Sequence, residues 1–330
     1  MADPRFYSKH LTTTMSKIWS FFQLIRIKNL LFIAVTQVFF YQLIIQSSYH
    51  KILGGNPLLS YNLFHWMVVA SLLIAGAGYI INDYFDLNID KINKPGKLIV
   101  DKEISRRWAM MWHFILSIAG LIITAYVAIQ LNNFLLFLLN GIAVILLWVY
   151  STTFKKKLLS GNVIISLLTA WVIFMLFVAE INWKSGSWIP ASNLALINIY
   201  KLAILYGGFA FMVSLVREVI KDMEDELGDR KYGCKTMPIS WGIHATKVFV
   251  SVWLIVLFGS LSAIMVYALF SAWYLLSLYI FCTLLAMIVS IFLNLKNAVA
   301  IEDYTKLTRQ VKLLMLMGIL SMILYHYYYG

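Results

Sequence analysis

Two runs of acidic residues carry their carboxylates at the same spacing. Their members are Asp83, Asp86 and Asp90 in "NDYFDLNID", and Asp222, Asp225 and Asp229 in "DMEDELGD". On an α-helix, residues three, four and seven positions apart share a face, so we expect each run to form a carboxylate stripe. Like charges at this spacing repel one another, and a divalent cation would remove that cost.

The residues around both runs indicate which cation and which ligand this chemistry would involve. Oxygen ligands with no His or Cys beside them favour Mg²⁺ over Zn²⁺. Basic residues also surround the acids: Lys91, Lys94, Lys97, Lys155, Lys156, Arg230, Lys231 and Lys235. One such cluster could be a solvated helix end. Two clusters of matched spacing, together holding 11 of the 15 acids, favour Mg²⁺ bridging a polyanion such as a diphosphate.

The elements that must position these acids are membrane helices. The chain has 330 residues, of which 61% are hydrophobic and only 13% are charged, against about 25% charged in soluble domains. Apolar runs predict nine spans, at 29–48, 61–84, 107–130, 133–150, 161–182, 199–220, 246–269, 272–294 and 311–329. We therefore predict an all-α polytopic membrane protein in a single bundle, with an N-terminal segment at 1–28 and a transmembrane domain at 29–330.

Basic residues then predict the orientation of the bundle. With these spans, 24 of the 27 Lys and Arg residues fall on one side, and the exceptions are Lys51, Lys184 and Lys201. Lys312 is counted with the connection before the last span. The positive-inside rule places the N-terminus and both acidic runs in the cytoplasm, in an integral protein of the cell (inner) membrane. Cytoplasmic loops facing anionic membrane lipids account for the net charge of +12, so nucleic acid is not expected as a partner.

The two acidic runs divide the chain into halves of similar plan. Each run follows the second helix of a four-helix unit, spans one to four in the first half and spans five to eight in the second. We therefore predict two pseudo-repeated units in parallel. A diphosphate held at the membrane edge indicates a lipid diphosphate, and bound metal makes diphosphate a better leaving group. An allylic carbocation would then be shielded by aromatic residues, which we expect from the second, fourth, fifth and sixth spans.

Four stretches resemble the motifs of the UbiA superfamily of intramembrane prenyltransferases. "NDYFDLNIDKINKP" resembles its N-D-x-x-D-x-x-x-D motif, and "KDMEDELGDRKYGCKTMPI" resembles its second acidic motif with the trailing G-x-K-T-[LM]-P. "RIKN" and "YSTTFKK" are similar to the first-helix and fourth-helix motifs. The matches run from residue 26 to about 240 in the family's order, and the family fold has nine transmembrane helices.

The resemblance implies a role for each matched residue. It implies metal binding by Asn82, Asp86 and Asp90 with Asp83 beside them, and by Asp225 and Asp229 with Asp222 as an additional acid. Asp86, Asp90, Asp225 and Asp229 would be the catalytic acids. Tyr150, Lys155, Arg230 and Lys235 would contact the diphosphate, together with Lys156 and Lys97 from the basic ring, and Arg26 and Asn29 would shape the pocket. The implied cofactor is Mg²⁺, and the implied partners are a polyprenyl diphosphate, a lipid or aromatic acceptor and membrane lipids.

Within the superfamily, the motifs are most similar to the geranylgeranylglycerol-phosphate geranylgeranyltransferase branch. That branch often reads N-x-P-x-R-P after the first motif, whereas here Lys97 and Leu98 stand for the Arg and the second Pro. Lys keeps the charge and loses the bidentate geometry. Prenylation of an aromatic acceptor in quinone or haem biosynthesis stays open. Outside this class, an ion-coupled transporter predicts acids nearer the bilayer midplane, and a CDP-alcohol transferase requires a D-G-x-x-A-R motif that the chain lacks.

Overall fold

A computed structural model of the protein describes residues 18–53, 55–93, 96, 98–182 and 193–329. Within these residues, nine helices are long and apolar enough to cross a membrane, which confirms the number predicted. The protein is therefore an all-α integral membrane protein. Residues 1–17 lie outside the described part, so the division at residue 28 stays a prediction.

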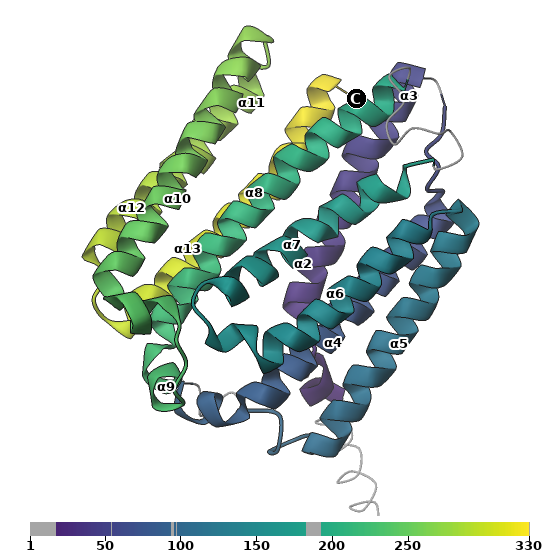
Figure 1. Ribbon diagram of the computed structural model, residues 1–330. Helices are drawn as coiled ribbons and strands as arrows, with labels where there is room; N and C mark the ends of the chain where they lie inside the picture. The colour runs from purple at the N-terminus through teal and green to yellow at the C-terminus, as the bar shows by residue number, and fades with distance from the viewer. Residues whose placement is uncertain (1–17, 54, 94–95, 97, 183–192, 330) are drawn as a thin grey trace, which may run out of the picture.

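The first four spans are consecutive antiparallel helices (Figure 1). Span one is made of α2 (Ile27–Phe39), the π-helical segment η1 (Phe40–Gln46) and α3 (Ser47–Leu53). The next three spans are α4 (Tyr61–Asn93), α5 (Arg106–Leu131) and α6 (Phe134–Thr152). A short 3₁₀ segment, η3 (Phe154–Lys156), leads into the second half.

The remaining five spans form the second half of the bundle. They are α7 (Ser160–Ala179), α8 (Leu194–Glu224), α10 (Met237–Phe270), the series α11 (Tyr274–Tyr279), η5 (Ile280–Leu285) and α12 (Ala286–Asn297), and α13 (Ile301–Tyr329). The short helix α9 (Glu226–Lys231) lies between α8 and α10. The predicted four-helix repeat stays a prediction, because no feature of this architecture tests it.

Two helices extend well past the ends that hydropathy predicted. α4 continues from the predicted end at residue 84 to Asn93, and α8 continues from 220 to Glu224. Hydropathy detects only the apolar part of a helix, whereas backbone hydrogen bonding continues into the polar residues. The first acidic run is therefore carried entirely on the end of α4.

Two other helices begin earlier than predicted. α10 begins at Met237 rather than 246, with a kink at Gly242, whose φ of 84° favours glycine. α13 begins at Ile301 rather than 311. Lys312, assigned by sequence to the preceding connection, therefore lies within α13.

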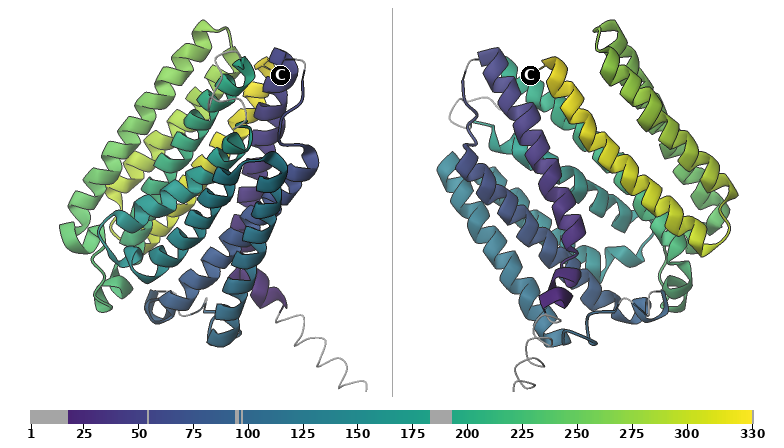
Figure 2. Two further views of the ribbon diagram at one scale, coloured as in Figure 1. Left: turned by 45° about the vertical axis from the view of Figure 1, so that its right-hand side comes forward. Right: turned by 180° about the vertical axis from the view of Figure 1, so that it is seen from behind.

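The bundle has two chemically different ends. α9 and the last turns of α4 lie at one end, which we call the motif end, whereas α3, α11 and the C-terminus lie at the other (Figure 1). α8 packs against α7, α10 and α13. α13 in turn contacts η1 and α2, and seen from behind the first span and α13 lie next to each other at their upper ends and diverge towards their lower ends (Figure 2). The first and last spans are thus neighbours, and they enclose a cavity with α4, α6, α7 and α8.

Candidate active site

The first acidic motif is organised around Asp86, on the extension of α4. Its carboxylate is 3% exposed and accepts a hydrogen bond of 2.7 Å from Asn82 Nδ2, one helical turn earlier. It also pairs with Lys155, which approaches from η3. Asp90 follows one turn later and is half-buried. The predicted stripe therefore exists on α4, and a cation from another element already contacts it.

Asp83 belongs to the same run but has a different partner. Its Oδ1 accepts a hydrogen bond of 2.6 Å from Arg26 Nη2. Arg26 precedes α2 in a left-handed conformation with φ of 53°, and its guanidinium lies 5.1 Å from the ring centroid of Tyr79. The structure thus uses Asp83 to hold Arg26, which lines the cavity.

The second acidic motif is not one continuous helical face, and that prediction is wrong. Asp222 lies in the last turn of α8 and accepts a hydrogen bond of 2.9 Å from Asn162 Nδ2. The helix ends there, because Asp225 adopts φ −93° and ψ 4° between α8 and α9. Asp229 then lies on α9 and is 5% exposed. The break turns α9 towards the end of α4.

Asn93 joins the two motifs directly. Its Nδ2 donates to the backbone oxygen of Asp225 at 3.0 Å, and its Oδ1 accepts from the backbone N–H of Gly228 at 2.8 Å. A Cβ added at Gly228 would lie 2.5 Å from Asn93 Oδ1, so only glycine permits this contact. Sequence reasoning missed Asn93, although it continues the spacing of Asp83, Asp86 and Asp90 by one more step of three.

Lys155 interacts with both motifs. Burial acts to lower the pKa of Lys155. The charge of Asp86 outweighs this effect, with smaller contributions from Tyr150 and Asp90, and raises the pKa above its usual range. Burial raises the pKa of Asp229 to about 6, with Lys155 opposing the shift and the charges of Asp225 and Asp86 adding to it. Asp229 on α9 is therefore within electrostatic range of both Lys155 and Asp86.

The backbone around Lys155 is held by a close approach to α7. A Cβ at Gly161 would lie 2.8 Å from the backbone oxygen of Phe154 and 3.0 Å from Cα of Lys155. On the other side of the segment, the backbone N–H of Lys235 donates to the backbone oxygen of Lys156 at 2.8 Å. The position of Lys155 is thus set by α7 and by the chain that follows α9.

The other predicted diphosphate contacts lie in different places. Tyr150, in the last turn of α6, is buried and lines the cavity. Lys156 and Lys235 are exposed, and so is Arg230, which pairs with Glu226 within α9. Lys97 lies outside the described residues. The structure therefore places Tyr150 and Lys155 in the site and the other described cations at its rim.

The residues present fit a metal that is shared with a ligand. Among the described residues, no three His, Cys, Asp or Glu side chains lie close enough to hold a metal ion by themselves. The oxygens of Asn82, Asp86 and Asp229 are hard donors, and Mg²⁺ usually takes few protein carboxylates and completes its shell with water and substrate phosphates. The donor set thus fits Mg²⁺ bound together with a diphosphate, not a cage made of protein alone.

A cavity of about 240 Å³ lies beside the motifs, enclosed by α2, α4, α6, α7, α8 and α13. Its aromatic lining is Phe32, Tyr79, Tyr150 and Trp171. The expectation from sequence is therefore partly wrong, because the first span supplies Phe32 and the sixth span supplies no aromatic residue.

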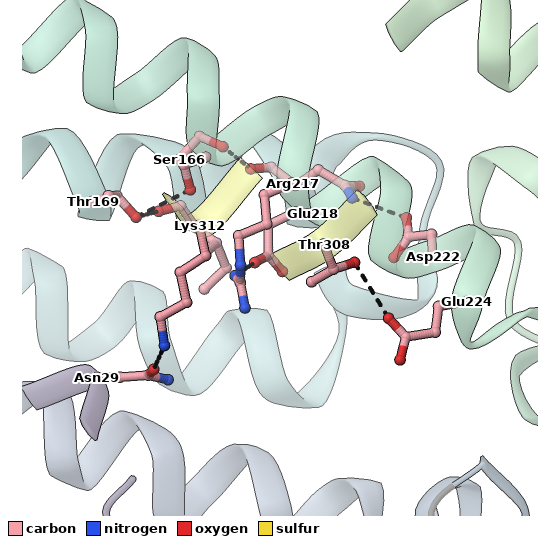
Figure 3. A network of polar contacts seen from close by, with 12 residues as sticks. Asn29, Ser166, Thr169, Arg217, Glu218, Asp222, Glu224, Thr308 and Lys312 are labelled. Atoms are coloured by element: carbon pink, nitrogen blue, oxygen red, sulfur yellow. Dashed lines mark hydrogen bonds and ion pairs between the residues drawn. The ribbon is translucent and has the colours of Figure 1, made fainter. Parts of the chain in front are cut away.

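The polar mouth of this cavity contains cations that sequence reasoning did not assign to the site. Arg217, Lys221 and Lys312 line it with Arg26 and Asn29, and Glu218 is the carboxylate beside them. Figure 3 shows Lys312 reaching Asn29, with the Arg217 and Glu218 pair next to it. Arg217 and Lys221 are four residues apart, a spacing that places both on one face of α8.

The fold is that of an integral membrane protein, and its acids, cations and cavity are suited to binding an anionic ligand. The profile of the UbiA prenyltransferase family matches residues 52–316. The protein therefore belongs to the UbiA prenyltransferase family, and it is a prenyltransferase.

Curated relatives give the comparison more detail. A digeranylgeranylglyceryl phosphate synthase of Methanospirillum hungatei is 33% identical over 213 residues, which is 64% of this chain and 66% of that protein. The corresponding synthase of Methanococcus maripaludis is 31% identical over 82% of this chain and 85% of its own length. That of Methanococcus aeolicus is 29% identical over 93% of this chain and 98% of its own length.

Solved structures share the fold along nearly the whole chain. One of a digeranylgeranylglyceryl phosphate synthase superposes with a TM-score of 0.62 and 24% identity, covering 93% of this chain and 98% of that one. A UbiA homologue from Archaeoglobus fulgidus bound to GPP and Mg²⁺ superposes with a TM-score of 0.56 and 16% identity, covering 92% of this chain and 99% of that one.

Proposed function

We propose that this protein transfers the prenyl group of an allylic polyprenyl diphosphate to a (geranylgeranyl)glycerol phosphate-type lipid, in a reaction that requires Mg²⁺. The observation that carries the proposal is the packing of α9 against the end of α4, which brings the second acidic motif beside the Asp86–Lys155 pair and an aromatic-lined cavity. The names of the curated relatives support the product class. The Archaeoglobus fulgidus homologue supports the donor and the metal, since it binds GPP and Mg²⁺.

Each motif residue takes a role that suits its place. We assign Asn82, Asp86 and Asp90 on α4, and Asp225 and Asp229 at α9, to Mg²⁺, because α9 packs against α4. Asp222 and Asp83 hold supporting positions, because they are engaged by Asn162 and Arg26. When bound, Mg²⁺ neutralises charge on the departing diphosphate.

Lys155 and Tyr150 are the protein's own contacts to the diphosphate. Lys155 supplies a fixed positive charge, and Tyr150 supplies a phenolic donor at the junction with the cavity. The exposed residues Lys156, Arg230 and Lys235 are close to this site along the chain and form its basic rim. Together they stabilise the charge that develops on the leaving group.

The cavity then protects the reacting carbon. Cleavage of the allylic C–O bond leaves a delocalised carbocation, which the rings of Tyr79, Tyr150 and Trp171 stabilise through their quadrupoles. The apolar walls exclude water, which would otherwise capture the cation. The acceptor hydroxyl oxygen forms the new C–O bond, and its proton passes to the departed diphosphate.

In this proposal, the motif end lies on the cytoplasmic side of the cell membrane. The basis is the distribution of basic residues, because Lys155, Arg230 and most other cations lie towards that end, whereas Lys51 and Lys201 lie towards the other. Both substrates then reach the site from the cytoplasmic leaflet.

Identification of the reaction product tests the proposed function directly. Purified protein in lipid vesicles is supplied with labelled geranylgeranyl diphosphate, Mg²⁺ and either geranylgeranylglyceryl phosphate or an aromatic acid, and products are identified by mass spectrometry. We expect a diether phosphate lipid, no product in EDTA, and recovery when Mg²⁺ is restored. Product on the aromatic acid alone would favour quinone-type prenylation, and full turnover in EDTA would overturn the metal requirement.

A further inference from the structure

Lys312 carries a positive charge that no carboxylate of the described chain neutralises. Its Nζ donates to Asn29 Oδ1 at 2.8 Å, and the ion pairs of the described residues do not include it. The side chain is half-buried in α13 and lines the cavity. A charge withdrawn from water without a counter-ion is costly, and in a membrane protein it indicates a functional partner.

Other positive charges act on the same point. The charges of Arg217 and Lys28 act on Lys312, and Lys221 lines the same cavity from α8. Of the acids, Glu218 alone is among the residues that line the cavity, and it is already paired with Arg217. The cavity lining thus contains more cations than carboxylates, and an anion would neutralise the excess positive charge.

This group comes from other elements than the contacts assigned to the donor. Lys155, Asp86 and Asp229 belong to η3, α4 and α9, whereas Asn29, Arg217 and Lys312 belong to α2, α8 and α13. Arg26 is paired with Asp83. A transferase with two anionic substrates requires a second set of anion contacts, and these three residues supply one along the same cavity.

We propose that Lys312, Arg217 and Asn29 form an anion subsite that binds the phosphate of the acceptor lipid. The inference rests on the proposed function and deepens it, because it explains a preference for a phosphorylated acceptor. Lys and Arg together bind phosphate through charge-assisted hydrogen bonds, and the Asn29 amide offers one more donor.

Binding is the readout that separates this subsite from turnover. Affinities for geranylgeranylglyceryl phosphate and for geranylgeranylglycerol, which lacks the phosphate, are measured by calorimetry in detergent without donor. For Lys312→Gln we expect about a tenfold to hundredfold loss of affinity for the phosphorylated lipid, because one charge-assisted hydrogen bond is lost. Affinity for geranylgeranylglycerol should be unchanged, and Lys312→Arg should restore most of the loss.

Two further variants keep the test decisive. Lys306→Gln removes the same charge from α13 at an exposed position paired with Asp303, and should change neither affinity. Asn29→Asp places a carboxylate beside Lys312, and we expect it to raise the thermal stability while weakening binding of the phosphorylated lipid. A purely structural role for Lys312 would not separate these two effects.

The outcomes distinguish a failure of the subsite from a failure of the proposed function. Equal losses for both lipids in Lys312→Gln, or a loss confined to geranylgeranyl diphosphate, would overturn the subsite. If Lys312→Gln weakens binding of the phosphorylated lipid alone while wild-type protein makes no diether product, the subsite stands and the proposed function fails.

Discussion

Asn93 and Gly228 bind the two acidic motifs to each other. Asn93 is the last residue of α4, and its side chain bridges the backbone of α9 at Gly228 and of the preceding break at Asp225. The contact is possible because position 228 has no Cβ. The relative position of the carboxylates is therefore set by a neutral amide, not by the acids themselves.

Replacing Asn93 with Ala should weaken the metal site without removing a carboxylate. Loss of an outer-shell hydrogen bond typically costs 10- to 100-fold in metal affinity, so the Mg²⁺ concentration for half-maximal activity should rise by about that factor. Asn88→Ala, at an exposed position of the same helix, is the matched control and should behave as wild type. An unchanged Mg²⁺ requirement in Asn93→Ala would contradict the bridging role.

Lys155 should be the cation whose loss is most damaging. Lys155→Gln leaves Asp86 without its partner and removes a fixed charge from the leaving group, so kcat/KM for the donor should fall by about 100-fold or more. Lys157→Gln removes an exposed charge that lies over the ring of Phe154, two residues away, and should have little effect. Similar losses in both variants would show that general basicity is the cause.

Gly161→Ala tests whether the backbone position of Lys155 matters. The added Cβ would meet the backbone of Phe154 and Lys155, so the segment must move away from α7. A small displacement of a catalytic group lowers the reaction rate strongly. We therefore expect kcat/KM to fall by roughly tenfold to hundredfold. Gly141→Ala adds the same methyl group in α6 where no atom lies within 4 Å, and its activity should equal that of wild type.

Glu180 predicts how stability depends on pH at the end opposite the motifs. It is 1% exposed and accepts hydrogen bonds from the backbone N–H groups of Leu58 and Leu59, and burial raises its pKa to about 7 against their effect. A carboxyl group whose pKa is raised by folding contributes its full stability at pH values below its pKa in the unfolded chain. This contribution is lost as the pH rises through the folded-state pKa of about 7. The Tm in detergent should thus fall between pH 5 and pH 8, by roughly 5 °C.

The controls for this pH effect are two glutamine variants. Glu180→Gln cannot titrate, so it should lower the Tm at pH 5 and make the fall towards pH 8 smaller, and the remainder of the fall is due to other carboxyl groups with a raised pKa, such as Asp229. Glu302→Gln, at an exposed position of α13, should keep the wild-type slope. A Tm that rises from pH 5 to pH 8 in wild type would contradict the raised pKa.

Sequence patterns predicted the membrane helices well, because crossing a bilayer requires long apolar segments that hydropathy detects directly. They also found both acidic motifs, whose spacing is local. The break at Asp225 was missed, because the spacing of Asp222, Asp225 and Asp229 fits one helix and the break appears only where α9 packs against α4.

Residues that interact across the bundle were harder to predict from the sequence than the helices and the acidic motifs. Lys312 is 283 positions from Asn29, and only the packing of α13 against α2 brings them together. Asn93 carries no charge and so gave no signal of its chemistry. Arg230 pairs with Glu226 on an exposed face of α9, because neighbours four residues apart meet on a helix, and its contact with the diphosphate stays a prediction.

Both acidic motifs are expected to hold one Mg²⁺–diphosphate unit, and the binding of an unreactive donor shows whether they do. Calorimetry with a thiolo analogue of geranylgeranyl diphosphate would compare wild type, Asp86→Asn and Asp229→Asn, each with and without Mg²⁺. Our account predicts that either substitution alone abolishes the Mg²⁺-dependent part of the affinity. Full Mg²⁺-dependent binding in either variant would contradict it.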